Sequence, residues 1–227
     1  MPYWIFIVGL GIVIQTIFIF FEYGTNKLAA LFAKSAAAAV FVILGILLSC
    51  ESNDPRYAWY ITAGLIFGMG GDVFLALRTL YQDKKSTMIF AIGIASFLIG
   101  HLVYIVVLLK LILPSFLIAF VASIILSGIL IPLMLKNINA PQKGLKIFGI
   151  IYFYIILLMF SCAALFLFLI PSTRSILFAI GAFLFTLSDF GLIFHLFGKK
   201  KVKYLRAANL SCYYIAQILI CLTILYV

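Results

Sequence analysis

The sequence predicts an all-α, polytopic integral membrane protein, a bundle of about eight transmembrane helices. Hydrophobic residues make up 67% of the 227 positions and charged residues only 10%, and the mean hydropathy is +1.30. This is more apolar surface than the core of a water-soluble protein could bury. Apolar stretches recur along the chain, each of about 20 residues, which as a helix matches the ~30 Å hydrocarbon layer. The shorter alternating segments of a transmembrane barrel do not occur in the sequence.

The helices follow in order because the apolar stretches are separated by polar breaks or by breaks with Pro or Gly. The first stretch lacks a basic leader and a small-residue cleavage site, so we expect a retained helix rather than a signal peptide. The expected spans are 3–22, 29–49, 58–78, 88–110, 114–135, 147–170, 175–196 and 205–226. No linker rich in Pro, Gly or Ser divides them, so we expect a single transmembrane domain over residues 1–227.

Basic residues are concentrated in alternate connections between these spans. The connections after the first, third, fifth and seventh spans hold Lys27, Arg78, Lys84, Lys85, Lys136, Lys143, Lys146, Lys199, Lys200, Lys201, Lys203 and Arg206. The other connections hold only Arg56, Lys110 and Arg174. By the positive-inside rule, the basic loops are cytoplasmic and both termini lie outside the cytoplasm.

The charge and the cysteines point away from several other classes of protein. The formal net charge is +10, but the basic residues lie in short loops, where orientation and anionic lipid explain them better than nucleic acid does. The four cysteines show no C-x-x-C spacing, so we expect neither a disulfide nor zinc. His101 and His195 are too few for a three-histidine zinc site. We therefore predict no metal, no cofactor and no nucleic-acid partner.

Two of the six acidic residues, Asp72 and Asp189, fall inside expected spans. Each lies about 10 Å from the cytoplasmic end of its helix, a depth at which a lone carboxylate costs on the order of 3 kcal/mol. One such residue could serve packing alone, through a neighbouring hydroxyl or lysine. Two aspartates at the same depth, on helices that run in the same direction, favour a functional role over packing alone.

Further polar residues fall inside the expected spans. Asn209, Tyr213 and Gln217 recur every four residues and form one stripe on the last span. Lys34 lies near the start of its span, so we favour a lysine that snorkels to the headgroups over one that acts at the site. His101 could make an interhelical hydrogen bond. The glycines before Asp72 are expected to allow close helix packing rather than to bind phosphate.

The sequence around the two aspartates suggests an internal repeat. GLIFGMGGDVFLAL from Gly64 and GAFLFTLSDFGLIF from Gly181 each place a glycine eight residues before the aspartate and a leucine three after it. A tandem four-helix repeat would set the two aspartates facing each other. Coincidence also accounts for so few identities in apolar sequence.

Taken together, five motifs resemble the YhhN-like lysoplasmalogenase family over residues 28–220. They are Lys34 early in the second span, GGDVFLAL around Asp72, G-x-x-x-F-x-x-x-H-x-x-Y from Gly93, SDFGLIF around Asp189 and YYIAQILI from Tyr213. Ser35 follows Lys34 where the family often has Pro, a departure that bears on Lys34.

The resemblance implies a membrane hydrolase, with a lysophospholipid or other ether lipid as substrate, in the inner membrane of a bacterium. It would cleave the vinyl-ether bond of lysoplasmalogens to a fatty aldehyde and a glycerophospho-alcohol. The expected catalytic residues are Asp72 and Asp189. The expected substrate-binding residues are Lys34, His101, Tyr104, Asn209, Tyr213, Tyr214 and Gln217. The basic loop from Lys199 to Arg206 is expected to lie beside the site and attract the substrate phosphate.

Three other functions fit membrane-embedded aspartates. An intramembrane aspartyl protease also uses two membrane-embedded aspartates, one in a G-x-G-D element and the other directly after a Tyr. Here Met69 occupies the first Gly position of that element, and Ser188 precedes Asp189. A proton-coupled transporter could relay protons through them. It would favour inverted repeats and helices broken at mid-membrane, whereas Pro132 is the one proline well inside a span. A structural role is the third possibility.

Overall fold

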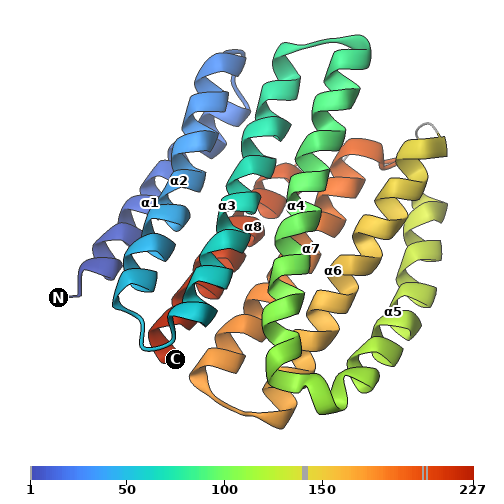
Figure 1. Ribbon diagram of the computed structural model, residues 1–227. Coiled ribbons are helices and arrows are strands. Elements are labelled where there is room, and N and C mark those ends of the chain that lie inside the picture. Colours follow the sequence, from blue (N-terminus) through green and yellow to red (C-terminus); the bar gives the residue numbers. More distant parts are fainter. Residues whose placement is uncertain (1, 140–142, 201, 203) are drawn as a thin grey trace. The chain divides into compact units, whose positions relative to one another are not determined.

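The computed structural model describes residues 2–139, 143–200, 202 and 204–227 (Figure 1). Over these residues the chain forms eight α-helices with short connections. They are α1 (Tyr3–Glu22), α2 (Lys27–Glu51), α3 (Pro55–Leu77), α4 (Asp83–Ile112), α5 (Phe116–Asn137), α6 (Lys143–Leu169), α7 (Thr173–Phe197) and α8 (Leu205–Leu222). Three short 3-10 turns, Arg78–Leu80, Leu113–Ser115 and Thr223–Tyr226, end α3, join α4 to α5 and follow α8.

The prediction of an all-α, multi-pass membrane protein is confirmed. Seven helical segments of the described chain are long and apolar enough to cross a membrane. One of them, Asp83–Asn137, contains both α4 and α5 and is 55 residues long, far more than the roughly 20 residues that one crossing needs. The helices begin and end close to the predicted spans, although α4 starts earlier than expected, at Asp83.

Polar residues at the helix starts explain several of these boundaries. The side chains of Asn26 and Asp54 accept hydrogen bonds from the backbone N–H groups of Ala29 and Tyr57, at 3.0 and 3.1 Å, and so cap α2 and α3. Ser172 and Ser175 form a reciprocal capping box at the start of α7. Such caps satisfy backbone donors that have no partner within the helix.

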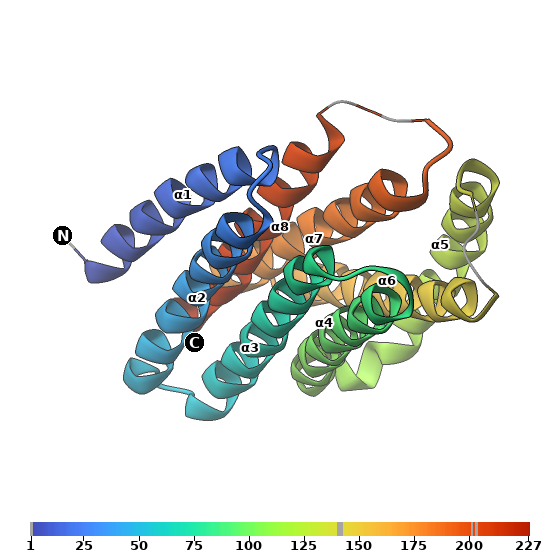
Figure 2. The same ribbon diagram turned by 90° about the horizontal axis from the view of Figure 1, so that it is seen from above.

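The contacts divide the chain into two compact units. The first runs up to Val103 and includes Ile224–Val227, and the second is Tyr104–Thr223. In the first unit α2 packs against both α1 and α3 (Figure 2). Helix α3 approaches α4 at glycines: a Cβ on Gly71 would lie 2.5 Å from the Phe97 ring, and one on Gly100 would lie 3.1 Å from the Gly64 carbonyl oxygen. This confirms the expected packing role of the glycines before Asp72.

In the second unit α6 packs against both α5 and α7, and α7 packs against α8. Helices α7 and α8 approach closely at Gly181, where a Cβ would lie 3.2 Å from the Ala216 carbonyl oxygen. An isolated antiparallel bridge between Ile138 and Gly198 joins the ends of α5 and α7. Both units thus place an aspartate-bearing helix, α3 or α7, tightly against the next helix. The expectations of one domain and of a tandem repeat stay predictions.

The membrane orientation can be tested directly. Because the basic residues favour the connections after α1, α3, α5 and α7, we expect a reporter fused after Val227 to lie outside the cytoplasm. A reporter inserted near Lys200 is expected in the cytoplasm. Paired phosphatase and fluorescent-protein fusions measure both positions. The opposite pattern would contradict the predicted topology.

Candidate active site

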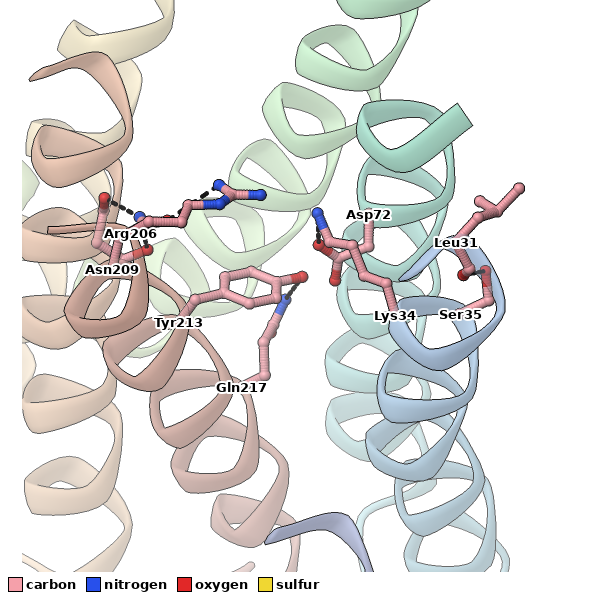
Figure 3. A network of polar contacts seen from close by, with 9 residues as sticks. Leu31, Lys34, Ser35, Asp72, Arg206, Asn209, Tyr213 and Gln217 are labelled. Carbon is pink, nitrogen blue, oxygen red and sulfur yellow. Dashed lines mark hydrogen bonds and ion pairs between the residues drawn. The ribbon is translucent and has the colours of Figure 1, made fainter. Parts of the chain in front are cut away.

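In the first unit, Lys34 on α2 and Asp72 on α3 form a buried ion pair (Figure 3). Lys34 Nζ lies 3.0 Å from Asp72 Oδ1, and the two side chains are 3% and 2% exposed. One turn before Lys34, the Leu31 carbonyl accepts a 2.9 Å hydrogen bond from the Ser35 hydroxyl. The pair brings two of the predicted site residues together from adjacent helices.

The ion pair corrects the favoured interpretation of Lys34. A snorkelling lysine extends its ammonium group to the headgroups, whereas this ammonium group is buried against a carboxylate. Isolated charges in lipid are costly, and a paired carboxylate keeps its negative charge at much lower cost. The short contact therefore gives the Asp72 carboxyl a cationic partner within the helix bundle of the first unit.

His101 on α4 is also buried in the first unit, at 1% exposure. It follows Phe97 by four residues and therefore lies on the same side of α4. That side faces α3, because the Phe97 ring lies against Gly71, the residue before Asp72. A role for His101 in substrate binding stays a prediction.

In the second unit, Asp189 on α7 is 4% exposed and accepts a 2.8 Å hydrogen bond from the hydroxyl of Tyr152 on α6. Sequence reasoning missed Tyr152, although a tyrosine within an otherwise apolar span was a usable signal. Tyr154 lies two residues later, and since the two tyrosines point to different sides of α6, the sequence could not decide between them. The structure identifies Tyr152 as the partner of Asp189.

The predicted polar stripe on α8 is buried and hydrogen-bonded. The Tyr104 hydroxyl donates to Gln217 Oε1 at 3.1 Å. Gln217 Nε2 in turn donates to the Tyr213 hydroxyl, also at 3.1 Å (Figure 3). The Tyr213 ring packs edge-on against Phe185 and Tyr214, with centroid separations of 5.3 and 5.0 Å. The structure thus links four predicted site residues, Tyr104, Tyr213, Tyr214 and Gln217, in one cluster.

Asn209, the first residue of the stripe, binds α7 directly next to Asp189. Its side-chain amide donates to the Ser188 hydroxyl at 2.9 Å and also to the Ser188 carbonyl. Arg206 contacts the Asn209 oxygen at 3.4 Å (Figure 3). Asn209 therefore holds the α7 backbone next to Asp189. The substrate-binding role expected for Asn209 stays a prediction.

The two aspartates have related but chemically different settings. Each receives its partner from the preceding helix, at nearly the same separation along the chain: Lys34 on α2 for Asp72, and Tyr152 on α6 for Asp189. One carboxyl faces a fixed positive charge and the other a neutral hydroxyl donor. The two aspartates lie in different units, and the expectation that they face each other stays a prediction.

Comparison with known proteins gives one match. The model of the YhhN family matches residues 29–224, which include α3 to α8 and nearly all of α2, but not α1. No curated protein matches the chain. No solved structure matches it either.

Proposed function

Because this chain belongs to the YhhN family, we propose that it is a membrane hydrolase that cleaves the vinyl-ether bond of lysoplasmalogens. The products are a fatty aldehyde and a glycerophospho-alcohol. The substrate is a single-chain lipid, which reaches intramembrane residues from the surrounding bilayer without leaving it. The proposed location is the inner membrane of a bacterium.

The reaction consumes one water and needs no electron donor. A proton adds to the alkenyl carbon that is not bonded to oxygen, which gives an oxocarbenium ion. Water adds to the cationic carbon, a proton is lost, and the hemiacetal collapses with transfer of a proton to the leaving oxygen. The chemistry therefore requires one group that donates a proton to carbon and one anion that stabilises the cation.

The two aspartates suit these two roles. Asp72 is the anion, because the Lys34 ammonium group lies 3.0 Å from it. Asp189 is the proton donor, because a carboxylic acid can accept from Tyr152 at Oδ2 while its proton occupies the other oxygen. Glycosidases divide acid and anion roles between two carboxyls in a similar way, which is an analogy of chemistry and not of fold.

One observation supports this proposal above the others: both buried aspartates have a defined partner, and the partners differ in charge. Enzymes that need an acid and an anion separate two carboxyls through their surroundings in this manner. The cluster of Tyr104, Tyr213 and Gln217 supplies hydroxyl and amide groups that could position the attacking water.

The proposal is tested with purified protein and three matched lipids. A lysoplasmalogen should release fatty aldehyde, whereas the saturated 1-alkyl ether and the 1-acyl ester with the same headgroup should not. Only the vinyl ether has an alkenyl carbon, whose protonation gives an oxocarbenium ion that water converts to a hemiacetal and then to an aldehyde. A protein that releases no aldehyde from the vinyl ether would contradict the proposal and leave the transporter or the protease-like enzyme as the function to test.

Replacement of Tyr152 by phenylalanine tests the role of its hydrogen bond to Asp189. We expect Tyr152→Phe to lower kcat about tenfold with little change in KM, the scale of one hydrogen bond to a charged or reacting group. Tyr154→Phe, on the same helix, is the matched control and should keep normal turnover. Equal activity of the two variants would show that Tyr152 has no part in positioning Asp189.

A further inference from the structure

A groove in the second unit lies on a different side of α7 from Asp189. It has a volume of about 560 Å³ and is bounded by the end of α5, one side of α7 and the start of α8. The α7 residues that line it are Leu187, Phe190, Gly191 and Phe194. Their spacing of three, four and seven residues places them on one face of the helix. At 100° per residue, Asp189 lies on roughly the opposite face.

The walls of the groove are apolar and well packed. The rings of Phe190 and Phe194 lie 4.8 Å apart, and Gly191 allows α8 to approach, since a Cβ there would lie 3.4 Å from Asn209 Cβ. Leu187 is 45% exposed at the groove. A volume of this size is typical of small-molecule sites, and an apolar wall of this kind suits an acyl chain.

One end of the groove is positively charged. Lys199 and Lys200, both exposed, line it next to the bridge between Ile138 and Gly198. The Lys199 ammonium group donates a 2.7 Å hydrogen bond to the Lys136 carbonyl at the end of α5, and the Lys199 backbone N–H donates to the Asn137 carbonyl at 3.1 Å. These bonds fix one cation beside the groove, and Lys200 adds a second.

We propose that this groove binds an anionic phospholipid of the bilayer, with its phosphate at Lys199 and Lys200 and an acyl chain along Leu187 to Phe194. Charge complementarity selects the headgroup, and the apolar wall selects a lipid over a soluble anion. Basic pockets between transmembrane helices on the cytoplasmic side recognise anionic headgroups in this way, and the positive-inside rule places this end of α7 on that side. This assigns Lys199 and Lys200 to a lipid of the bilayer rather than to the substrate phosphate expected from the sequence, and it does not depend on the proposed hydrolysis.

Native mass spectrometry of the purified full-length protein tests the site. Phosphatidylglycerol should bind more tightly than phosphatidylcholine of the same chain length, and millimolar inorganic phosphate should not displace it. Lys200→Gln should weaken phosphatidylglycerol binding about fivefold, the scale of one lysine near an anionic lipid. Lys84→Gln, at an exposed lysine in the first turn of α4, should leave phosphatidylglycerol binding unchanged.

A second variant tests the chain-binding wall. Leu187→Trp should weaken the binding of both lipids, because the larger side chain fills the groove. Ile180→Trp, two turns away on α7, should leave lipid binding unchanged, although Ile180 and Leu187 are equally exposed, at 45%. Equal binding of the two lipids, or Lys200→Gln indistinguishable from Lys84→Gln, would overturn the proposal. It would also be overturned if Lys200→Gln raised the KM for a lysoplasmalogen in detergent free of anionic lipid, since the groove would then belong to the substrate.

Discussion

Asp189→Asn is expected to lower the turnover of a lysoplasmalogen at least ~100-fold, the usual scale for loss of a general acid. The amide can still accept the hydrogen bond from Tyr152 but cannot protonate the alkenyl carbon. A neutral amide is also easier to place in lipid than a carboxylate, so the variant should remain folded. Aldehyde release under single-turnover conditions measures the loss directly.

Asp72→Asn is expected to give a loss of similar size, because it removes the anion that stabilises the cation. In the proposed mechanism the two groups act in one transition state, so the double variant should be little worse than either single variant. Asp83→Asn, in an exposed position at the start of α4, is the matched control. If a folded Asp189→Asn or Asp72→Asn protein kept near-normal activity, that aspartate would have no part in the reaction and would serve packing alone.

The second large effect concerns stability. Lys34→Met removes the cation from a buried ion pair and leaves the Asp72 carboxylate without it, which is expected to cost about 3–5 kcal/mol in the free energy of unfolding. The double variant Lys34→Met with Asp72→Asn removes both charges and should recover most of that loss. Its activity should stay low, because the anion is gone. Denaturant unfolding in detergent micelles measures the stabilities.

Lys27→Met on the same helix is the control, since Lys27 is exposed at the start of α2. If Lys34→Met were as stable as Lys27→Met, the ion pair would not stabilise the fold. If the double variant were less stable than Lys34→Met, the loss could not come from an uncompensated charge.

Much of the fold follows from the hydropathy of the sequence. Apolar stretches of membrane length, separated by short polar breaks, predicted eight helices, and eight are present in the described chain. The start of α4 was placed too late because Asp83, Lys84 and Lys85 read as a loop. Charged residues can continue a helix beyond the lipid, and hydropathy does not detect this extension.

The burial of the candidate site residues was predicted, but their pairings were not, and Tyr152 was missed. Burial of Asp72 and Asp189 and the stripe on α8 followed from polarity and helical spacing. The partners Lys34 and Tyr152 lie far from them in the sequence, and one sequence does not determine which helices adjoin. From the sequence alone both asparagine variants should fold equally well, whereas the ion pair predicts that Asp72→Asn is the less stable of the two.

The most direct test of the account is the isotopic composition of the aldehyde formed in D₂O. Protonation of the alkenyl carbon predicts one deuterium on the carbon next to the carbonyl of each aldehyde molecule, measured by mass spectrometry after immediate trapping. The same product should be almost absent with Asp189→Asn. Aldehyde that forms without deuterium, or deuterated aldehyde formed at the normal rate by Asp189→Asn, would contradict proton transfer from this aspartate.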